Sequence, residues 1–389
     1  MKKSVNIIGT RGIPGNYGGF ETFAERLSLY LVGRGWDVNV YCQINKSEKN
    51  LLRETEWNRI RQINIAAKDS SAGTIFFDIK SAMDAKDRGN VDLVLGYNTG
   101  FLSVFQRLYG QFVVINMDGI EWRRQKWSLP AKVWFFLNEL VAANVSHAII
   151  ADHPKIEQHL RNRTYKRPVM IPYGADPIRE APWVRISGLD IKPDRYFISV
   201  CRIVPENSIL EIVRSYIKAA PQGVPLVVLG KLDERDPYHR EVRAAANGAV
   251  LFPGAIYDKE ALASLRSHAR AYVHGHQVGG TNPSLVEALG AGSAVLAHDN
   301  RFNRWTAGEK QFYFASEEAC REAFAKLAQD DHAIAAAREA AWQRFEEAFQ
   351  WHQILHAYEC LLEKAVARSA PKQVVRFGQR FGGFLTRQG

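Results

Sequence analysis

The sequence predicts an α/β fold with two Rossmann-like domains, each built on a parallel sheet. Short apolar runs rich in β-branched residues alternate with helical stretches, and this alternation starts a second time after an interruption near residues 175–195. Most of the runs lack alternation of apolar and polar residues, as expected for strands covered by helices on both faces of a sheet. The chain of 389 residues is also longer than one hydrophobic core usually serves.

The first series of predicted strands forms the N-terminal domain. The helix after the first strand is predicted over residues 20–33, because Phe20, Phe23, Leu27 and Leu31 form an apolar stripe along one face. The six strands of this series are predicted at residues 5–9, 38–42, 91–96, 112–118, 147–152 and 169–174.

The second series forms the C-terminal domain. Residues 175–195 contain three prolines and a glycine without periodicity, so we place the hinge there and expect domains over residues 1–177 and 190–350. A long helix near residues 352–366 is expected to begin a C-terminal segment, 352–389, that packs back on the N-terminal domain. Strands are predicted at residues 196–201, 225–230, 249–254, 271–275 and 294–299, with helices near 208–219, 258–267 and 283–289. Ligands of such sheets bind at the carboxyl ends of the strands, facing a cleft between the domains.

The amino-acid composition of the chain limits the kinds of molecule that it is expected to bind. A net charge of +10 favours an acidic partner, namely a nucleotide, a nucleic acid or an anionic membrane. No nucleic-acid module is recognisable, so we expect no nucleic acid. The four cysteines lie far apart, which fits a reducing cytoplasm, and no run approaches the length of a membrane span. No D-x-D or other metal-ligand spacing stands at a strand end, so we expect neither a metal nor a cofactor.

Residues 279–299, GGTNPSLVEALGAGSAVLAHD, combine a loop, a helix start and a buried strand. Asn282 suits the helix cap and Pro283 the first helical position. The N–H groups of such a helix start favour phosphate, and Glu287 one turn later can accept hydrogen bonds from a ribose diol. The alternative is an ordinary capped core helix with Glu287 in water.

Residues 9–22, GTRGIPGNYGGFET, form a glycine-rich connection between the first strand and the first helix. Gly18 and Gly19 stand directly before the helix and are the candidates for phosphate contact. The glycine spacing does not match the dinucleotide fingerprint G-x-G-x-x-G, which disfavours an NAD-dependent oxidoreductase. The alternative is a surface loop with turn glycines.

Two charged residues at strand ends are candidates for catalysis. Arg202 follows the first strand of the second series and could hold a diphosphate and stabilise it as it leaves. Asp118 ends the strand 112–118 and could orient an acceptor hydroxyl group. The alternatives are a structural ion pair for Arg202 and a turn cap for Asp118. His147, His153, His274 and His276 are interpreted as hydrogen-bonded core or loop residues.

In order and spacing, the motifs resemble those of retaining family 4 glycosyltransferases, which have the GT-B fold. The N-terminal motif resembles the subgroup that includes bacterial rhamnosyltransferases of surface-polysaccharide assembly. The resemblance covers most of the chain and rests on residues 9–22, 116–127, 171–176, 202–207, 279–299 and 298–305.

The resemblance implies a metal-independent transfer of a sugar, with dTDP-rhamnose the favoured donor, to a saccharide or lipid-linked saccharide. It implies that Gly18 and Gly19 approach the donor phosphates, that Arg202 holds the diphosphate and that Glu287 binds the ribose. A phosphate oxygen of the donor would accept the proton of the acceptor hydroxyl. Further donor contacts are implied for Thr281, Asn282, Ser284 and Leu285.

The chain departs from the family pattern at two positions. Gly279 stands where a glutamate usually contacts the transferred sugar, and Asn207 stands where a lysine usually follows the arginine. Lys231, after the strand 225–230, is a candidate to assist Arg202. These departures keep open a catalytically degenerate nucleotide-binding or scaffolding protein, and a nucleotide-sugar epimerase of the same fold is the other alternative.

Two segments suggest attachment to the cytoplasmic face of a membrane. Residues 122–136 mix five aromatic side chains with four cations, as amphipathic surface segments do. The tail after Glu363 has six basic residues and no acidic ones, and it could lie on an anionic bilayer or form a solvated end.

Overall fold

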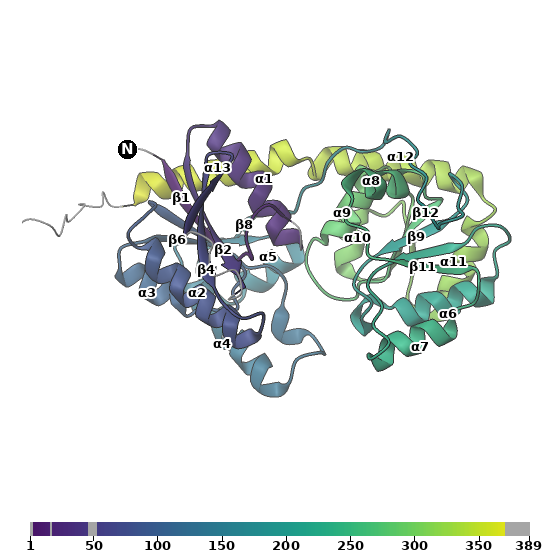
Figure 1. Cartoon of the computed structure of the whole chain (residues 1–389), viewed down its shortest axis with the longest axis horizontal. Coiled ribbons are helices and arrows are strands. Elements are labelled where there is room, and N and C mark those ends of the chain that lie inside the picture. Colours follow the sequence, from purple (N-terminus) through teal and green to yellow (C-terminus); the bar gives the residue numbers. More distant parts are fainter. Residues whose placement is uncertain (1–2, 16–17, 46–52, 370–389) are drawn as a thin grey trace, which may run out of the picture.

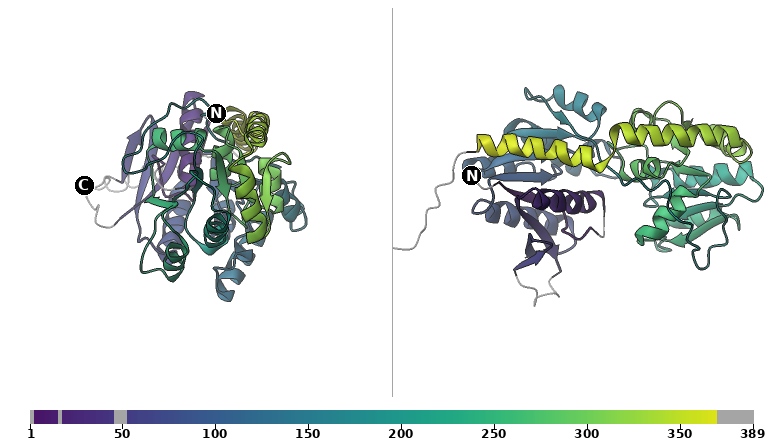
Figure 2. Two further views of the ribbon diagram at one scale, coloured as in Figure 1. Left: turned by 90° about the vertical axis from the view of Figure 1, so that its right-hand side faces the viewer. Right: turned by 90° about the horizontal axis from the view of Figure 1, so that it is seen from above.

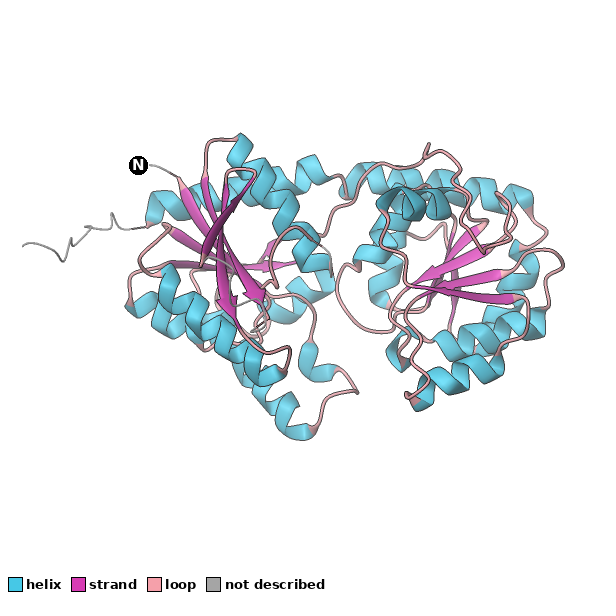
Figure 3. Cartoon of the chain, in the orientation of Figure 1, coloured by secondary structure: helices cyan, strands magenta, loops and turns pink. Residues whose placement is uncertain are grey.

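The computed structural model describes residues 3–15, 18–45 and 53–369, and it shows two α/β domains next to each other (Figure 1). Each domain contains one sheet, and all strand pairs except one are parallel. The predicted fold class is therefore confirmed. Figure 3 shows helices on both faces of both sheets, which explains why most of the strands are apolar runs without alternation.

The N-terminal sheet has eight strands in the order β3-β4-β2-β1-β5-β6-β7-β8. The strands are β1 (Ser4–Ile8), β2 (Asp37–Ile44), β3 (Glu54–Trp57), β4 (Ile60–Ala66), β5 (Val91–Leu95), β6 (Phe112–Asn116), β7 (Ala148–Ala151) and β8 (Val169–Met170). The antiparallel hairpin of β3 and β4 was not among the predicted strands. Its edge strand ETEW is largely exposed and polar, so it carries no apolar run.

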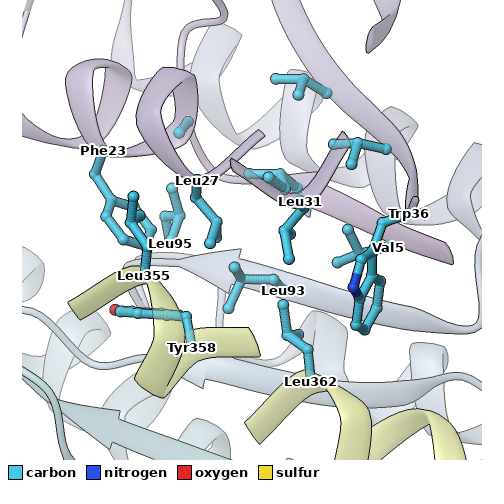
Figure 4. Close-up of a cluster of buried hydrophobic side chains, with 14 of the residues drawn as sticks. Val5, Phe23, Leu27, Leu31, Trp36, Leu93, Leu95, Leu355, Tyr358 and Leu362 are labelled. Carbon is cyan, nitrogen blue, oxygen red and sulfur yellow. The ribbon is translucent and has the colours of Figure 1, made fainter. Parts of the chain in front are cut away.

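Helices cover the N-terminal sheet in two layers. Helix α1 (Gly19–Gly33) and helix α13 (Trp351–Arg368) lie on one face. Figure 4 shows Leu27 of α1 and Leu355 and Leu362 of α13 in one cluster with Leu93 and Leu95 of the sheet. The other face carries α2 (Ser71–Ala85), α3 (Leu102–Leu108), α4 (Leu129–Val145) and α5 (Pro154–Arg161).

The C-terminal sheet has six parallel strands in the order β11-β10-β9-β12-β13-β14. The strands are β9 (Phe197–Val200), β10 (Leu226–Leu229), β11 (Val250–Gly254), β12 (Ala271–His274), β13 (Val295–His298) and β14 (Phe312–Phe314). Its helices are α6 (Ile209–Ala219), α7 (Pro237–Ala245), α8 (Lys259–Ser267), α9 (Pro283–Gly290), α10 (Arg301–Ala307), α11 (Glu317–Leu327) and α12 (Asp331–Ala348).

The C-terminal helix returns to the N-terminal domain, as predicted. Figure 2 shows α12 along the C-terminal domain and α13 along the N-terminal domain. Glu359 of α13 is buried and accepts hydrogen bonds from Tyr30 (2.9 Å), Trp36 (3.4 Å) and Arg34 (3.4 Å). The end of the basic tail, residues 370–389, lies outside the described residues.

The two segments that join the domains run next to each other. The amide of Ala175 donates to the carbonyl of Phe349 at 2.9 Å, in a bridge between the connection after β8 and the connection before α13. Arg26 of α1 forms an ion pair with Asp176 in the same region. The chain therefore crosses between the domains twice at one place, within the segment where the hinge was expected and beside the start of α13.

Candidate active site

Loops at the carboxyl ends of the two sheets contact each other. Arg124, after β6, pairs with Glu206, after β9, at 2.8 Å. Asp152, after β7, accepts the amide of Thr281, after β12, at 2.9 Å. Because ligands of α/β sheets bind at these strand ends, the contacts define the candidate site.

Arg202 stands at the end of β9 and is exposed. Its guanidinium group makes no hydrogen bond or ion pair with any residue that the structure describes, in contrast to the structural alternative. The positive charge of Arg202 nevertheless acts to lower the pKa of both Asp118 and His276, so both groups lie near enough to interact with it. An arginine with this freedom is available to an anionic ligand.

Gly230, the residue after β10, lies next to the end of β9, which leads to Arg202. A Cβ atom on Gly230 would lie 2.5 Å from the carbonyl oxygen of Cys201, so the two strand ends are in contact. Lys231, the next residue, is exposed. Two cations therefore follow adjacent strand ends of the C-terminal sheet.

Asn207, which stands where the resemblance leads one to expect a lysine, holds the backbone of Arg202. Its side-chain amide donates to the carbonyl of Arg202 at 2.7 Å, and the residue is buried. A buried side chain at this position cannot extend to a diphosphate. The structure thus assigns Asn207 the position of a backbone anchor for Arg202.

Asp118 follows β6 in a left-handed backbone conformation, with φ of +52°. Burial, reinforced by repulsion from Glu121, raises the pKa of Asp118 to about 6, although Arg124 and Arg202 act in the opposite direction. Aspartate adopts this conformation readily at turns, and the carboxyl group of Asp118 interacts with the amide of Gly119, so the geometry fits the turn cap as well as a functional role.

Asp152 is a site residue that the sequence interpretation missed. Burial and the nearby charge of Asp118 raise the pKa of Asp152 to about 7, and its Oδ1 has no hydrogen-bond partner within the described residues. A Cβ atom on Gly280 would lie 2.2 Å from that oxygen, so only glycine fits there. The signal was present in the sequence, because Asp152 ends the predicted strand 147–152 as Asp118 ends the strand 112–118.

Gly279 lies against the N-terminal domain. A Cβ atom on Gly119 would be 3.4 Å from the Cα of Gly279, and Gly279 itself has φ of +128°, which favours glycine. The C-terminal loop that lacks the usual glutamate therefore rests beside Asp118 and Asp152. The carboxyl groups in this part of the site come from the N-terminal domain.

The start of α9 lies beside the end of the glycine loop. A Cβ atom on Gly19 would lie 2.8 Å from Cγ of Pro283. Asn282 caps the helix by accepting the amide of Ser284 at 3.0 Å, and the Ser284 hydroxyl donates to Val200 at 2.8 Å. These polar groups of Ser284 are thus used within the domain.

The side chains of three other residues predicted to contact the donor are buried or bonded within the protein. The side chain of Leu285 is fully buried, so only its backbone could face a donor. The Thr281 hydroxyl donates to the carbonyl of Asp152. Glu287 pairs with Arg266 at 2.6 Å and remains partly exposed, so it is neither a free ribose ligand nor a purely solvated side chain.

Carboxylates of α1 hold the glycine loop at the N-terminus. Glu21 accepts the amide of Arg11 at 2.9 Å, and Glu25 accepts the amide of Gly15 at 2.6 Å. These amides are therefore unavailable to a phosphate. Of the predicted glycines, Gly19 lies at the domain contact, with the exposed Gly18 directly before it.

The four histidines divide into two groups. His147 accepts the amide of Val113 at 3.0 Å, and His153 caps α5, so both are structural as interpreted. His274 and His276 stack with ring centroids 4.3 Å apart. Burial together with the charges of Arg202 and Arg124 lowers the pKa of His276 to about 3, so its imidazole is neutral at the site.

The N-terminal domain contains a cavity of about 270 Å³ between the ends of β1 and β5 and the helices α2 and α3. Asp78 and Thr99 line it, and the Thr99 hydroxyl donates to Asp78 at 2.9 Å. Burial raises the pKa of Asp78 to about 6. The sequence offered no signal for this residue, because an aspartate within a helix usually faces water.

Comparisons with known proteins assign both halves of the chain. Residues 2–176 match a domain of unknown function, DUF1972, and residues 186–344 match the family described as glycosyl transferases group 1. No curated protein sequence matches the chain significantly.

Solved structures share the fold along nearly the whole chain. Sucrose-phosphate synthase from Thermosynechococcus elongatus is similar with a TM-score of 0.78 and 16% identity, over 95% of this chain and 100% of that one. HepE of Anabaena, in complex with UDP-glucose, is similar with a TM-score of 0.70 and 12% identity, over 94% and 100%. A trehalose-phosphate synthase from Burkholderia xenovorans is similar with a TM-score of 0.66 and 10% identity, over 93% and 100%.

These structures confirm the predicted GT-B fold. The matched C-terminal domain carries the assignment of activity, since fold alone does not determine function. With a group 1 glycosyltransferase domain in a GT-B fold, the chain is a glycosyltransferase.

Proposed function

We propose that the enzyme transfers a sugar from a nucleoside-diphosphate sugar, with retention of anomeric configuration, to a saccharide or lipid-linked saccharide. The observation that carries the donor class is Arg202, an exposed arginine at a strand end without a partner among the described residues. Gly19 and the start of α9 meet at the domain contact. The UDP-glucose named in the HepE structure supports the same donor class.

The proposed reaction needs positioned charge rather than a protein base. The bond between C1 of the sugar and the diphosphate oxygen breaks, and its electron pair leaves with the diphosphate, which Arg202 stabilises. The acceptor oxygen bonds to C1 on the same face, and its proton passes to a phosphate oxygen. Asp118 orients the acceptor hydroxyl. No step uses a metal ion.

The cavity beside Asp78 is proposed to hold part of the acceptor. Its volume of about 270 Å³ suits a single sugar ring, and hydroxyl and carboxyl groups line it. Hydrogen-bonding side chains in such a cavity can distinguish one sugar from another, because an unmatched buried polar group is costly. We propose synthesis of a surface polysaccharide at the cytoplasmic face of the membrane as the setting, with dTDP-rhamnose as the first donor to test.

A thermal-shift screen across nucleoside-diphosphate sugars tests the donor class, because a ligand that binds the folded state raises the melting temperature. We expect dTDP- or UDP-linked sugars to stabilise the protein. A donor that stabilises it is then incubated with and without acceptor saccharides, and the products are followed by NMR. Products formed without an acceptor would indicate an epimerase.

The specific observations in favour of a degenerate scaffolding protein are Gly279 and Asn207, which lack the side chains usual in the family. Absence of any nucleotide binding at millimolar concentrations would favour that alternative. Binding without transfer to any saccharide would leave the donor site in place and reject the proposed reaction.

A further inference from the structure

We propose that the outer surface of α2, α3 and α4 is a docking face for an anionic phospholipid membrane. This inference deepens the membrane partner proposed above by assigning it a surface. Large hydrophobic side chains with substantial exposure are concentrated in one domain. Within the described part of the chain, all of them except Tyr257 lie in the N-terminal domain.

Helix α3 turns its polar side inward. Ser103 donates to the carbonyl of Gly100 at 2.7 Å, and Gln106 donates to the buried Asp92 at 2.8 Å. The outward residues include Phe105 and Leu108, and Leu108 is 77% exposed. A surface helix normally shows the opposite arrangement, with its apolar stripe facing the core.

Helix α4 repeats this inversion. Its inner side carries Asn138, which accepts the amide of Phe101 at 3.0 Å, and the buried Glu139. Its outer side carries Leu129, Val133 and Leu137, which are spaced by four residues and therefore form one stripe. Leu129 is 74% exposed.

Helix α2 contributes a third apolar edge. Asp78 and Ser81 point inward, and the Ser81 hydroxyl donates to the carbonyl of Phe77 at 2.8 Å. Phe76 and Met83 point outward, and Met83 is 53% exposed. Three neighbouring helices thus bury polar residues beside apolar ones and expose large apolar side chains on their outer sides.

The three helices form one continuous layer, on the face of the sheet opposite α1 and α13 (Figure 1). The ring of Phe101 lies 6.5 Å from Phe105 and 5.8 Å from Trp134, which links α3 to α4. The ammonium group of Lys86 lies 5.2 Å from the ring of Tyr109, which links α2 to α3. A contiguous apolar patch of this kind marks an interaction surface.

The expected membrane segment 122–136 is divided by the fold. Phe135 of α4 is buried, and Trp122 and Trp127, which precede α4, are partly buried against the same core cluster. Trp134 and Val133 remain on the outer side. The docking face therefore includes part of that segment together with α2 and α3.

The charge on this face identifies its partner. Each helix carries one outward cation, namely Lys80, Arg107 and Lys132. The acidic residues of the three helices are Asp78 and Glu139, which are buried, and Asp84, which is paired with Arg88. An apolar surface with interspersed cations complements an anionic bilayer.

The same charge argues against two other occupants. A second copy of this face would bring cations of equal sign together. The terminal residues 370–389 contain four basic and no acidic residues, so they also repel the face. None of the helices in the described residues is long and apolar enough to cross a membrane, so the inferred contact is peripheral.

The face and the cavity use the same helices. Asp78 of α2 and Ser103 and Gln106 of α3 line the cavity on the inner side, whereas Met83 and Leu108 lie on the outer side. Docking would therefore bring the cavity proposed for the acceptor within a helix diameter of the lipid headgroups. This placement suits an acceptor carried on a lipid.

The test is co-sedimentation of the full chain with vesicles of phosphatidylcholine alone or mixed with phosphatidylglycerol. We expect binding to the mixed vesicles only. The double variant Phe105→Ser/Leu108→Ser should lower the vesicle partition coefficient at least about tenfold, since two apolar side chains lose their contact. The charge variant Lys80→Glu/Lys132→Glu should lower it as well. Tyr257→Ser and Arg243→Glu, on the other domain, are the matched controls and should bind as the wild type does.

Equal binding by the wild type and the Phe105→Ser/Leu108→Ser variant would overturn the proposal, because the tail is intact in both. Absence of wild-type binding to mixed vesicles would overturn it too. A dimer that the same substitutions dissociate, in sedimentation velocity without vesicles, would identify a second copy as the occupant instead. Unchanged melting temperatures and donor binding show that the variants fold. Because the vesicle assay contains no nucleotide sugar, its outcome is independent of the proposed donor.

Discussion

At the scale of single residues, the polar side chains of the site differ in whether they already have hydrogen-bond or ion-pair partners within the protein. Arg202 has no partner among the described residues, whereas Glu287 is held by Arg266 and Asn207 supports the backbone of Arg202. A substitution of Arg202 is therefore expected to change catalysis without changing stability. A substitution of Glu287 is expected to change both stability and donor binding, so both must be measured.

Replacing Arg202 by alanine should lower kcat/KM by about 2–4 kcal/mol in transition-state stabilisation, because a preorganised charge at the leaving diphosphate is lost. The melting temperature should change little, since the side chain makes no hydrogen bond or ion pair with the described residues. Steady-state kinetics and calorimetric melting measure the two effects. Near-normal turnover would remove Arg202 from the mechanism.

Replacing Glu287 by alanine should raise the donor KM more than it lowers kcat. It should also cost about 1–3 kcal/mol of folding free energy, because Arg266, with a side chain only 8% exposed, loses its ion-pair partner. Glu287→Gln keeps a hydrogen bond to Arg266 and is the control for the structural part. Unchanged donor affinity in titration calorimetry for both variants would reject the ribose assignment.

At the scale of secondary-structure elements, α13 joins the N-terminal core although the sequence places it after the C-terminal domain. Its apolar side packs with α1, and Glu359 receives the three hydrogen bonds from Tyr30, Trp36 and Arg34. Burial opposes ionisation of Glu359, but these donors outweigh it and hold the pKa below its usual value. The helix is thus anchored by a buried carboxylate.

Glu359→Gln should lower the free energy of unfolding by about 1–3 kcal/mol, because hydrogen bonds to a charged acceptor are lost. The pKa is lower in the folded state, so this stabilisation is complete above the ordinary pKa of 4.5 and disappears as the pH falls through the folded value. Denaturant unfolding at neutral and acidic pH measures it. A variant deficit that persists unchanged at strongly acidic pH would contradict this assignment.

At the scale of the whole molecule, the domains are joined by contacts between loops at the carboxyl ends of their strands. Asp152 accepts the amide of Thr281, and Gly280 fits against the carboxyl group only because it has no side chain. The Arg124–Glu206 ion pair lies in the same interface. Closure of the two domains therefore depends on a few close polar contacts.

Asp152 should make this closed arrangement sensitive to pH. Burial and Asp118 raise its pKa from 3.8 to about 7, so the folded state binds a proton that the unfolded state releases. Stability should accordingly fall as the pH rises from about 4 to about 7, and Asp152→Asn should flatten this dependence. Differential scanning calorimetry across this range measures it.

Asp118, whose pKa is raised to about 6, titrates in part of the same range, so Asp118→Asn is the necessary comparison. The pKa of Asp78 is also raised to about 6, whereas the lowered pKa of His276 acts on stability in the opposite direction. The predicted fall in stability should therefore be reduced in each variant and reduced further in the double variant. A profile for Asp152→Asn that matches the wild type would exclude Asp152 as the source.

Sequence patterns predicted most of the architecture because strand and helix signals are local. The apolar runs located eleven strands, and capping residues located the start of α9 at Asn282 and Pro283. Strands β3, β4 and β14 escaped prediction, and β3 carries no apolar run. Helices α2, α3 and α4 escaped it too, since their outward apolar residues conflict with the usual pattern. Arg202 was recognised because a charged residue directly after an apolar run is itself a local signal.

The sequence by itself determined two parallel-sheet domains, a candidate donor site with Arg202 and α9, and a chain rich in positive charge. Only the tertiary structure decided that Asp152 lies on Gly280, that Arg266 holds Glu287, and that the membrane-like aromatic residues divide between core and surface. The physical reason is the distance along the sequence over which each interaction acts. Periodicity and capping act between residues a few positions apart, whereas burial, pKa and partner choice depend on contacts that close only when distant segments pack.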